Sequence, residues 1–329
     1  MEDRDATAEE RRIGEVNAGI YCFDVPMLFR ALRATRPDNA QGEFYLPDTL
    51  SILREDGRKV AAIHHDDPWE VLGVNSRAEL ARVTDLINRR IIEGWMDRGV
   101  TVIDPARTCI GPDVKIGRDT VLYPNLHLEG RTVIGEDCVL HPGCFLRDTR
   151  VDDGAVLLPY CVAQDSRIGP RARVGPFAHL RPGTELGPEV RIGNFVELKK
   201  ARLGHGTKAN HLSYLGDTEI GADCNIGAGT ITCNYDGVSK HKTTIENGVF
   251  VGSDSQLVAP VTVRRGAYIG SGSTIVEDVP AGALALGRAR QRNILGWVGR
   301  KRREREAAAK SGGGAPKRAG AKPPPHRAR

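Results

Sequence analysis

The 329-residue sequence predicts a mainly β protein, built as a solenoid of very short strands with a smaller α/β segment and a long helix before it. Three observations support this prediction. Aliphatic residues recur every six positions, glycine often follows them, and aromatic residues are scarce, with three Trp, seven Tyr and seven Phe. A period of six fits neither an α-helix at 3.6 residues per turn nor a strand that alternates every two residues.

The six-residue period supports a coil of three equal sides. Six residues make one short strand and a corner, with the aliphatic side chain inside, so three units close a triangular coil of about 18 residues, stacked about 4.8 Å from the next. A narrow interior favours Ile, Val and Leu, and a corner favours glycine because it has no Cβ to clash. The periodic positions are Ile110, Ile116, Leu122, Leu128, Ile134, Leu140, Leu146, Ile168, Val174, Leu180, Leu186, Ile192, Ile220, Ile226, Ile245, Val251, Leu257, Val263, Ile269 and Ile275. This pattern resembles the hexapeptide-repeat, left-handed parallel β-helix.

Two segments interrupt the period, around 199–214 and at 232–242. We expect both to form loops on a face, since insertions into a solenoid become loops. Asp236-Gly237 in the second is a good turn dipeptide, so a plain hairpin is one interpretation. Its neighbouring Asn, Tyr and two Lys favour a loop that binds a ligand.

The residues before the repeat read as mixed α/β. Segments 16–23 and 59–64 have strand-like composition, and 27–34 resembles a short helix. Ser76 and Glu79 have capping-box spacing, and the apolar residues that follow at helical spacing predict a helix over 77–98. We therefore expect four parts, 1–75, a linker helix at 76–100, the β-helix at 101–287, and an arm and tail at 288–329.

The positive charge is concentrated at the C-terminus. The whole chain has a net charge of +5, yet residues 288–329 hold 14 Lys and Arg against 2 Asp and Glu, a net +12, which leaves −7 for the rest. From residue 311 the tail is too poor in apolar residues to fold, and we expect disorder. Such a tail could contact nucleic acid or anionic lipid; a solvated appendage is the favoured interpretation.

Other features bear on the cell compartment. No apolar run approaches the roughly 18 to 20 residues of a membrane span, and the charged N-terminus lacks the apolar stretch of a signal peptide. The seven cysteines form no Cys-x-x-Cys pair. We therefore expect free thiols and a reducing, cytoplasmic location.

Five ordered motifs point to one family. They are Arg181-Pro182-Gly183, the run from Gly193-Asn194-Phe195 to Lys199-Lys200, the run from His211-Leu212-Ser213-Tyr214 to Asp217, Asn225-Ile226-Gly227-Ala228-Gly229-Thr230, and Asn234-Tyr235-Asp236-Gly237. With Lys240, they resemble the acetyltransferase half of the bifunctional N-acetylglucosamine-1-phosphate uridylyltransferase/glucosamine-1-phosphate acetyltransferase family. The resemblance runs from Glu2 to about Trp297.

The resemblance implies that residues 1–75 match only the last part of a nucleotidyltransferase domain, without its Gly-rich phosphate loop. Glu2, Asn17 and Asn75 match residues that contact the UDP-sugar. Asn75 also matches one of two magnesium ligands, whose aspartate partner would lie upstream of Met1. Because magnesium prefers octahedral oxygen coordination with carboxylates, we expect this chain alone to lack uridylyltransferase activity, the one activity for which the family needs magnesium.

The resemblance further implies acetyl transfer from acetyl-CoA to the amine of glucosamine-1-phosphate. The product, N-acetylglucosamine-1-phosphate, leads to UDP-N-acetylglucosamine and to peptidoglycan and lipopolysaccharide. The family is a homotrimer with sites shared between chains, and closed threefold symmetry is a common solution. Direct attack is the family's route, so Cys233 is not expected to carry the acetyl group.

The residue roles follow from the same resemblance. His211 matches the general base, a role that suits an imidazole with a pKa near neutrality, and Glu197 would support it. The oxyanion would be held by a backbone N–H near Asn234 and Tyr235. The substrate residues are Arg181, Lys199 and Lys240 for the phosphate, Tyr214 and Asn225 for the sugar, and Asn234 for the amine. The acetyl-CoA contacts are Ala228, Asn234, Tyr235, Ser253, Ser271 and Arg288.

Other interpretations of these residues stay open at this point. A lone histidine is more often structural, the cations could form a solvated face, and Ala228 could simply suit a tight coil. A zinc hydratase on the same scaffold would need three converging histidines; His205 and His211 are candidates without a clear third. A non-catalytic trimer that binds sugar nucleotides is the other alternative.

Overall fold

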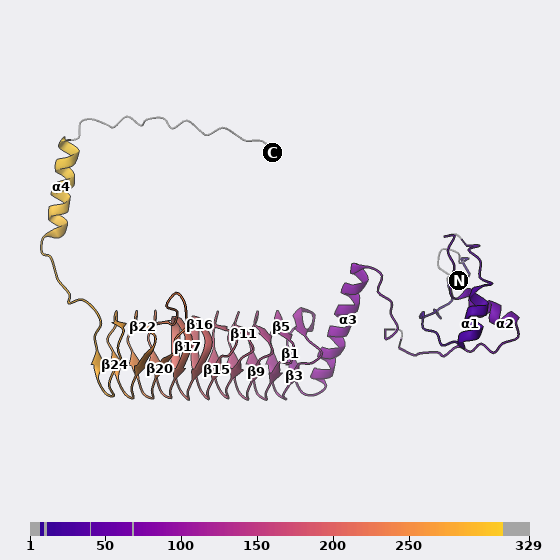
Figure 1. The fold of residues 1–329 in the computed structure, drawn as a ribbon, viewed down its shortest axis with the longest axis horizontal. Helices are drawn as coiled ribbons and strands as arrows, with labels where there is room; N and C mark the ends of the chain where they lie inside the picture. Colours follow the sequence, from indigo (N-terminus) through magenta and orange to yellow (C-terminus); the bar gives the residue numbers. More distant parts are fainter. Residues whose placement is uncertain (1–6, 10–11, 40, 68, 312–329) are drawn as a thin grey trace.

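The computed structural model describes residues 7–9, 12–39, 41–67 and 69–311, and most of these form one parallel β-solenoid of about ten turns. Figure 1 shows the coils stacked in a row, with a helix against one end and another beyond the opposite end. The mainly β fold class and the hexapeptide-repeat β-helix predicted from the period are confirmed.

The solenoid has three faces, each a column of short parallel strands from successive coils. Face 1 contains β3 (Lys115–Ile116), β6 (Val133–Ile134), β9 (Arg150–Val151), β12 (Arg167–Ile168), β15 (Glu185–Leu186), β20 (Thr243–Ile245) and β23 (Val261–Val263). Face 2 contains β1 (Thr101–Val102), β4 (Val121–Leu122), β7 (Val139–Leu140), β10 (Val156–Leu157), β13 (Arg173–Val174), β18 (Asn225–Ile226), β21 (Phe250–Val251), β24 (Tyr268–Ile269) and β26 (Leu284–Ala285).

Face 3 completes the triangle, and two long strands join all three faces. Face 3 contains β2 (Thr108–Ile110), β5 (Leu126–Glu129), β8 (Phe145–Arg147), β11 (Val162–Gln164), β14 (His179–Leu180), β19 (Ile231–Cys233), β22 (Gln256–Val258) and β25 (Thr274–Ile275). The long strands are β16 (Arg191–Leu203) and β17 (Lys208–Ile220), which pair in parallel through each face. We call the corners between faces edge 1/2, edge 2/3 and edge 3/1.

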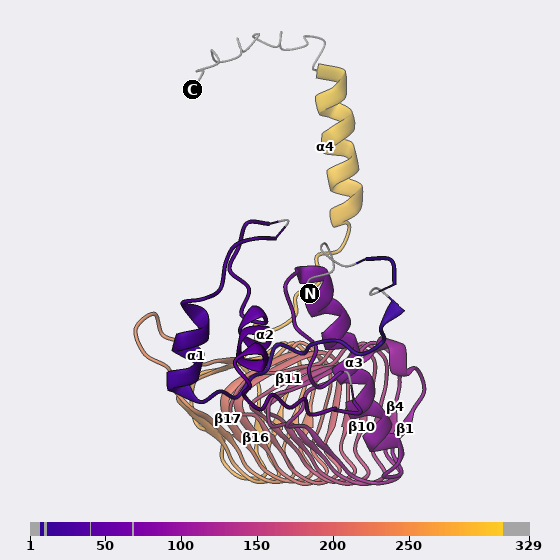
Figure 2. The ribbon, with the colours of Figure 1, turned by 90° about the vertical axis from the view of Figure 1, so that its right-hand side faces the viewer.

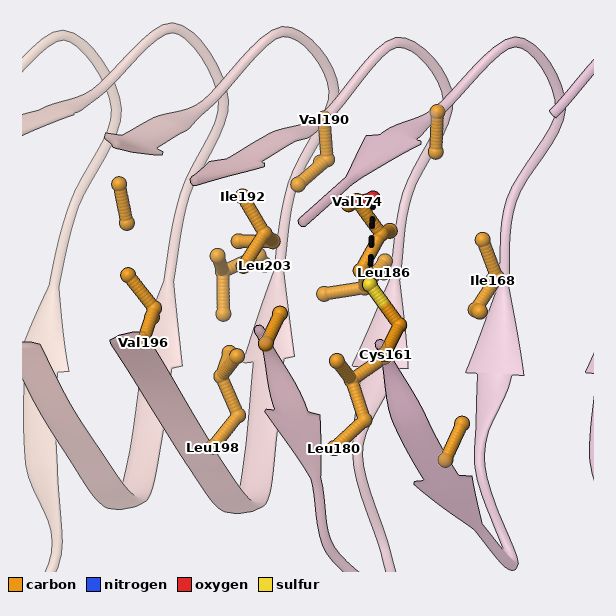
Figure 3. Close-up of a cluster of buried hydrophobic side chains, with 14 of the residues drawn as sticks. Cys161, Ile168, Val174, Leu180, Leu186, Val190, Ile192, Val196, Leu198 and Leu203 are labelled. Carbon is orange, nitrogen blue, oxygen red and sulfur yellow. Dashed lines mark hydrogen bonds between the residues drawn. The ribbon is translucent and has the colours of Figure 1, made fainter. Parts of the chain in front are cut away.

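The periodic aliphatic residues form the core, as predicted. All of them are buried, and in one coil Ile168, Val174 and Leu180 come from faces 1, 2 and 3 in turn. Figure 3 shows their side chains meeting inside the coil, with those of the next coil beside them. Burial of an aliphatic side chain of this size contributes about 1.5–3 kcal/mol, so the repeat itself stabilises the solenoid.

The corners explain why glycine follows the aliphatic residue. A Cβ on Gly193 would lie 1.8 Å from the backbone oxygen of Asn210, and one on Gly117 would lie 2.5 Å from backbone atoms of Gly135 on the next coil. Glycine is therefore needed for the close approach of coils. The left-handed backbone conformation falls two residues later, at Phe195 (φ 57°) and its equivalents.

The loop predicted around 199–214 is wrong. β16 and β17 stay in continuous register, with Glu197 opposite Tyr214 and Leu198 opposite Leu215. The repeat shortens to 17 residues per coil here, so the aliphatic spacing changes without any insertion. The second interruption is a loop, as predicted, and it closes as a hairpin through an antiparallel bridge between Tyr235 and Lys240.

The first part of the chain contains two short helices, α1 (Val25–Leu32) and α2 (Asp48–Glu55). α1 corresponds to the helix predicted at 27–34 and is capped by Asp24, whose Oδ1 accepts the backbone N–H of Met27 at 3.1 Å; α2 was not predicted. The predicted strands at 16–23 and 59–64 are wrong, since the described residues there form no strand. Strand-like composition alone does not form a strand without a partner to pair with.

The linker helix is α3 (Arg77–Met96), close to the predicted 77–98. The predicted capping box is present: the Ser76 hydroxyl accepts the Glu79 N–H at 3.2 Å, and Glu79 accepts the Ser76 N–H at 2.9 Å. Asn88 of α3 bonds the backbone of the first coil through Thr108 and Ile110. α3 thus covers one open end of the solenoid, as Figure 2 shows along its axis.

The chain continues past the last coil into α4 (Trp297–Ser311), which is rich in arginine and stands away from the solenoid in both views. Trp297 and Val298 at its start are exposed. Within the described ranges, no helix combines the length and the apolar character that crossing a membrane requires.

Candidate active site

Three cations gather at edge 3/1. Arg181 and Lys199 follow face 3 on adjacent coils, and Lys240 comes from the hairpin. The ammonium of Lys240 lies against that of Lys199 and lowers its pKa, with a smaller effect from Arg181. We call Arg181, Lys199 and Lys240 the cation cluster. Like charges so close together create a strong preference for an anion between them.

Glu197 lies beside the cation cluster. Its carboxylate accepts a hydrogen bond from Arg181 Nη1 at 2.7 Å, an ion pair that raises the pKa of the guanidinium. Both side chains are about two-fifths exposed. Glu197 therefore pairs with Arg181 in this chain, whereas the sequence had suggested a supporting role beside His211.

Tyr214 and Asn234 converge over Gly216, in the middle of β17. A Cβ on Gly216 would lie 2.4 Å from the Tyr214 hydroxyl and 2.8 Å from Nδ2 of Asn234. Asn234 is 7% exposed, and its Nδ2 donates to the carboxylate of Asp217. The sequence analysis gave Gly216 and Asp217 no role, although both stand in the motif that begins at His211.

The hairpin that carries Lys240 is held by Asp236. Its carboxylate accepts the backbone N–H groups of Val238 at 2.7 Å and Ser239 at 2.6 Å, and it lies 2.6 Å from Nε2 of His241. These bonds keep the pKa of Asp236 well below its usual value. These bonds fix the hairpin that carries Lys240, so the hairpin interpretation is confirmed, and ligand binding by this loop stays a prediction.

His211 lies at edge 2/3, where β17 turns through Leu212 with a φ of 40°. The side chain is exposed, not inside the coil, and its Nδ1 lies 3.0 Å from Oδ1 of Asn194 on the preceding coil. Asn194 was also given no role by the sequence analysis. The register of β16 and β17 places Asn194 and His211 opposite each other.

The residues matched to acetyl-CoA contacts continue along this same edge. Backbone hydrogen bonds run across it from Gly229 to Leu212, from Asp254 to Ala228 and from Gly272 to Ser253. Nη1 of Arg288 donates to the backbone oxygen of Ser271 at 2.8 Å. Successive coils therefore align His211, Ala228, Ser253, Ser271 and Arg288 along edge 2/3.

The remaining predicted residues lie apart from these two groups. Asn225 is on face 2, and Tyr235 is exposed on the hairpin, where its hydroxyl donates to the Gly237 oxygen at 2.6 Å. Asn17 and Asn75 lie before the solenoid, where Asn17 contacts Tyr21. Glu2 lies outside the described residues.

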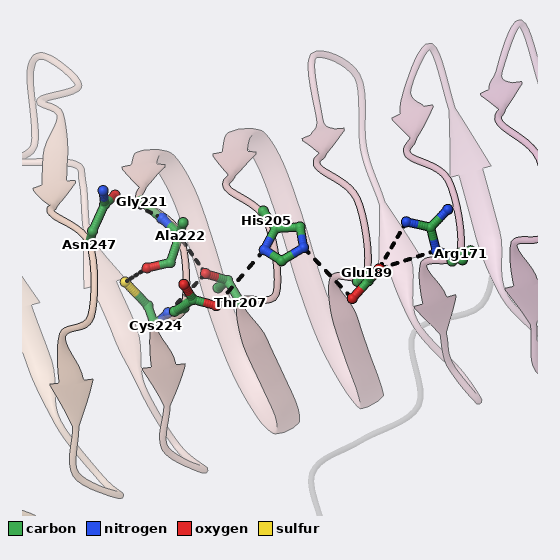
Figure 4. A network of polar contacts seen from close by, with 9 residues as sticks. Arg171, Glu189, His205, Thr207, Gly221, Ala222, Cys224 and Asn247 are labelled. Atoms are coloured by element: carbon green, nitrogen blue, oxygen red, sulfur yellow. Dashed lines mark hydrogen bonds and ion pairs between the residues drawn. The ribbon is translucent and has the colours of Figure 1, made fainter.

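The two candidate zinc histidines, His205 and His211, lie at different edges of the solenoid. His205 is at edge 1/2, where its ring lies 3.7 Å from Glu189 and 3.9 Å from Asp223, whereas His211 is at edge 2/3. Figure 4 shows His205 in contact with Glu189, which is paired in turn with Arg171. In the part of the chain that the structure describes, no three His, Cys, Asp or Glu side chains could together hold a metal ion.

The sequence matches two families of repeats. Residues 113–148 and 165–200 match "Bacterial transferase hexapeptide (six repeats)", and residues 242–277 match "Hexapeptide repeat of succinyl-transferase". One solved structure, the UDP-N-acetylglucosamine acyltransferase of Francisella novicida, is 15% identical with a TM-score of 0.41, covering 62% of this chain and 73% of that one. A TM-score this low supports no inference about the function of this chain.

Curated relatives are much more similar. The "Bifunctional protein GlmU" of Heliobacterium modesticaldum is 50% identical over 301 residues, 92% of this chain and 66% of the relative. That of Brevibacillus brevis is 49% identical (92% and 66%), and that of Geobacillus thermodenitrificans is 48% identical (93% and 67%). The chain spans about two thirds of the length of these relatives, and at this identity and coverage it belongs to the GlmU family.

Proposed function

We propose that this chain transfers the acetyl group of acetyl-CoA to the amine of glucosamine-1-phosphate. The observation that carries the proposal is the cation cluster. Arg181, Lys199 and Lys240 converge beside the Tyr214 hydroxyl and the Asn234 amide, so a phosphate would lie next to groups suited to a sugar. Arginine offers a bidentate fork to a phosphate, and each lysine adds charge.

The chemistry then needs a base and a leaving group. The substrate ammonium gives a proton to His211, and the freed amine attacks the thioester carbonyl. The tetrahedral intermediate loses its second nitrogen proton to solvent and collapses with loss of the coenzyme A thiolate, which takes the first proton back from the imidazolium, so the products are the neutral amide and the free thiol. A backbone N–H near Asn234 and Tyr235 would hold the oxyanion. Burial raises the pKa of Cys233, so this neighbouring thiol is a poor nucleophile, in line with direct transfer.

The acetyl-CoA site would follow edge 2/3. Ala228, Ser253 and Ser271 are small residues on successive coils beside His211, and Arg288 at the end of this row suits a coenzyme phosphate. In this arrangement the thioester end of the coenzyme would lie toward His211. Asn225 would approach the sugar from face 2.

We propose a homotrimer in which neighbouring chains share each site. One chain holds His211 at edge 2/3 and the cation cluster at edge 3/1, at opposite margins of face 3. A neighbouring chain packed beside face 3 would place one of its own edges against this face. Support comes from an exposed ladder along edge 2/3, where Tyr160, Phe177 and Phe195 stack at 5.3 and 5.4 Å and Leu212 continues the row.

Further proposals concern the other parts of the chain. We assign acetyl transfer to 101–287, with a nucleotidyltransferase remnant at 1–75, a linker at 76–100 and an arm from 288. Magnesium prefers oxygen ligands that include carboxylates, and among the described residues no three His, Cys, Asp or Glu side chains could together hold a metal ion, so we assign no magnesium-dependent step to Asn75. All seven cysteines are free, which fits the reducing cytoplasm.

The test is a thiol-release assay with acetyl-CoA. We expect turnover with glucosamine-1-phosphate and much less with glucosamine, because only the former carries the phosphate. His211→Ala should lose about 100- to 10,000-fold in kcat, the usual contribution of a general base. Equal rates with both amines would contradict the role of the cation cluster, and no thiol release from the wild type would leave the sugar-nucleotide-binding trimer as the better interpretation.

A further inference from the structure

We propose that Asn194 is the positioning residue of His211, holding its ring in the tautomer that keeps Nε2 free to accept a proton. The inference deepens the proposed acetyltransferase function and rests on it. It concerns a residue that the family resemblance left without a role, and it is carried by one contact and by the surroundings of that contact.

The contact determines where the imidazole proton lies. Oδ1 of Asn194 is 3.0 Å from Nδ1 of His211, and an amide oxygen can only accept a hydrogen bond. The tautomer that completes this hydrogen bond carries its proton on Nδ1 and keeps the lone pair on Nε2. Since the His211 side chain is exposed, this lone pair is open to a substrate, as a general base requires.

The surroundings keep Asn194 in place. It is half-buried between Gly193, where any Cβ would meet the Asn210 backbone oxygen at 1.8 Å, and Phe195, whose ring stacks on Phe177 at 5.4 Å. The two strands pair here with Asn194 opposite His211, so the coil-to-coil register keeps the two residues side by side.

The partner of His211 is neutral, which distinguishes this site from a histidine–carboxylate pair. The closest acidic residue on β16, Glu197, is bonded to Arg181 at 2.7 Å. Across the described ranges no ion pair joins His211 to a charged group; Lys208 on β17 and Glu197 on β16 are the charged residues that flank this turn. A neutral acceptor orients the ring without adding a negative charge, which would stabilise the imidazolium and oppose release of its proton.

The first test is the tautomer itself, read from ¹⁵N NMR of histidine-labelled full-length protein, with His211→Gln used to assign the signals. The wild type should show a protonated Nδ1, and Asn194→Leu, similar in size but without an acceptor, should shift His211 toward protonated Nε2. In the thiol-release assay, Asn194→Leu should lower kcat about 100-fold, with KM for both substrates changed less than about twofold.

A second variant separates orientation from simple structural loss. Asn194→Asp keeps an acceptor but adds a charge, so it should restore protonated Nδ1 and recover rate at high pH, while moving the acidic limb of the kcat profile up by about one pH unit. Asn247→Asp is the matched control: its Oδ1 accepts the Ala222 N–H at 2.9 Å at edge 1/2, and its profile should stay at that of the wild type.

The outcomes distinguish the two levels of inference. If wild-type His211 carries its proton on Nε2, or if Asn194→Leu keeps the wild-type tautomer and kcat, the positioning role is wrong even though acetyl transfer stands. If the wild type releases no thiol, the proposed function fails, while the tautomer measurement still decides whether Asn194 orients the ring.

Discussion

Replacing Gly216 by alanine should damage the proposed sugar site without harming the fold. The new Cβ would lie 2.4 Å from the Tyr214 hydroxyl and 2.8 Å from Nδ2 of Asn234, whereas ordinary contacts begin near 3.4 Å. The hydroxyl must therefore retreat by about 1 Å, a displacement that can cost about 100-fold in rate when it misplaces a substrate. The backbone of Gly216 is not left-handed, so alanine can adopt it.

Stability should change little, because alanine also lowers the entropy of the unfolded chain, by about 0.4–1 kcal/mol, which offsets part of the crowding. We expect kcat/KM for glucosamine-1-phosphate to fall about 100-fold, with an unchanged KM for acetyl-CoA and a nearly unchanged Tm. Tyr214→Phe removes the nearest crowded atom, so Gly216→Ala should cost much less in that background. A wild-type kcat/KM for the sugar phosphate in Gly216→Ala would refute the assignment of Tyr214 and Asn234 to the sugar.

Three further predictions follow from charge and packing. Lys240→Met should raise KM for glucosamine-1-phosphate about 10- to 100-fold, the usual value of a charged hydrogen bond, and leave KM for acetyl-CoA unchanged in the thiol-release assay; equal rises would place the coenzyme here instead. Lys240 lowers the pKa of Lys199 in the folded state, so keeping Lys199 protonated destabilises the fold. This destabilisation is complete below the lowered pKa and absent above the ordinary value of 10.5. Lys199→Met should therefore raise Tm slightly at pH 7, by calorimetry, and lose this advantage as the pH approaches 10.5. Phe177→Asn, which still suits a left-handed backbone, should shift the mass in light scattering from three chains toward one, and an unchanged mass would exclude the ladder from the interface.

The fold was predictable because each aliphatic residue has the same task in every coil. Ile168, Val174 and Leu180 each point inward from a different face, so their spacing in the sequence reports the geometry directly. The prediction failed where the geometry is not local. The 17-residue coils at β16 and β17 read as an insertion, and the strand-like segment 16–23 found no partner to pair with.

The sequence named the residues of the candidate site but not their arrangement in space. The motifs named His211 and Lys199 together, whereas the coil register separates them onto edges 2/3 and 3/1. Glu197 was expected beside His211, and its carboxylate is bonded to Arg181. Which polar residues meet depends on whether a coil has 17 or 18 residues, since a change of one residue at a corner moves each side chain relative to its neighbours on the next coil.

The backbone of the aromatic ladder supports an interface along edge 2/3. Tyr160, Phe177 and Phe195 all have a left-handed φ, which costs about 1–2 kcal/mol each for residues with a Cβ. The two stacked ring pairs stabilise the chain by only about 0.5–1.5 kcal/mol each. The three rings also stay 47–56% exposed in the single chain. A glycine at these positions would remove the backbone cost, as it does at Gly143 on the preceding coil. Burial of the three rings against a neighbouring chain, at about 1.5–3 kcal/mol for a fully buried side chain, would outweigh that cost, so the ladder is better explained by contact with another copy than by the stability of one chain.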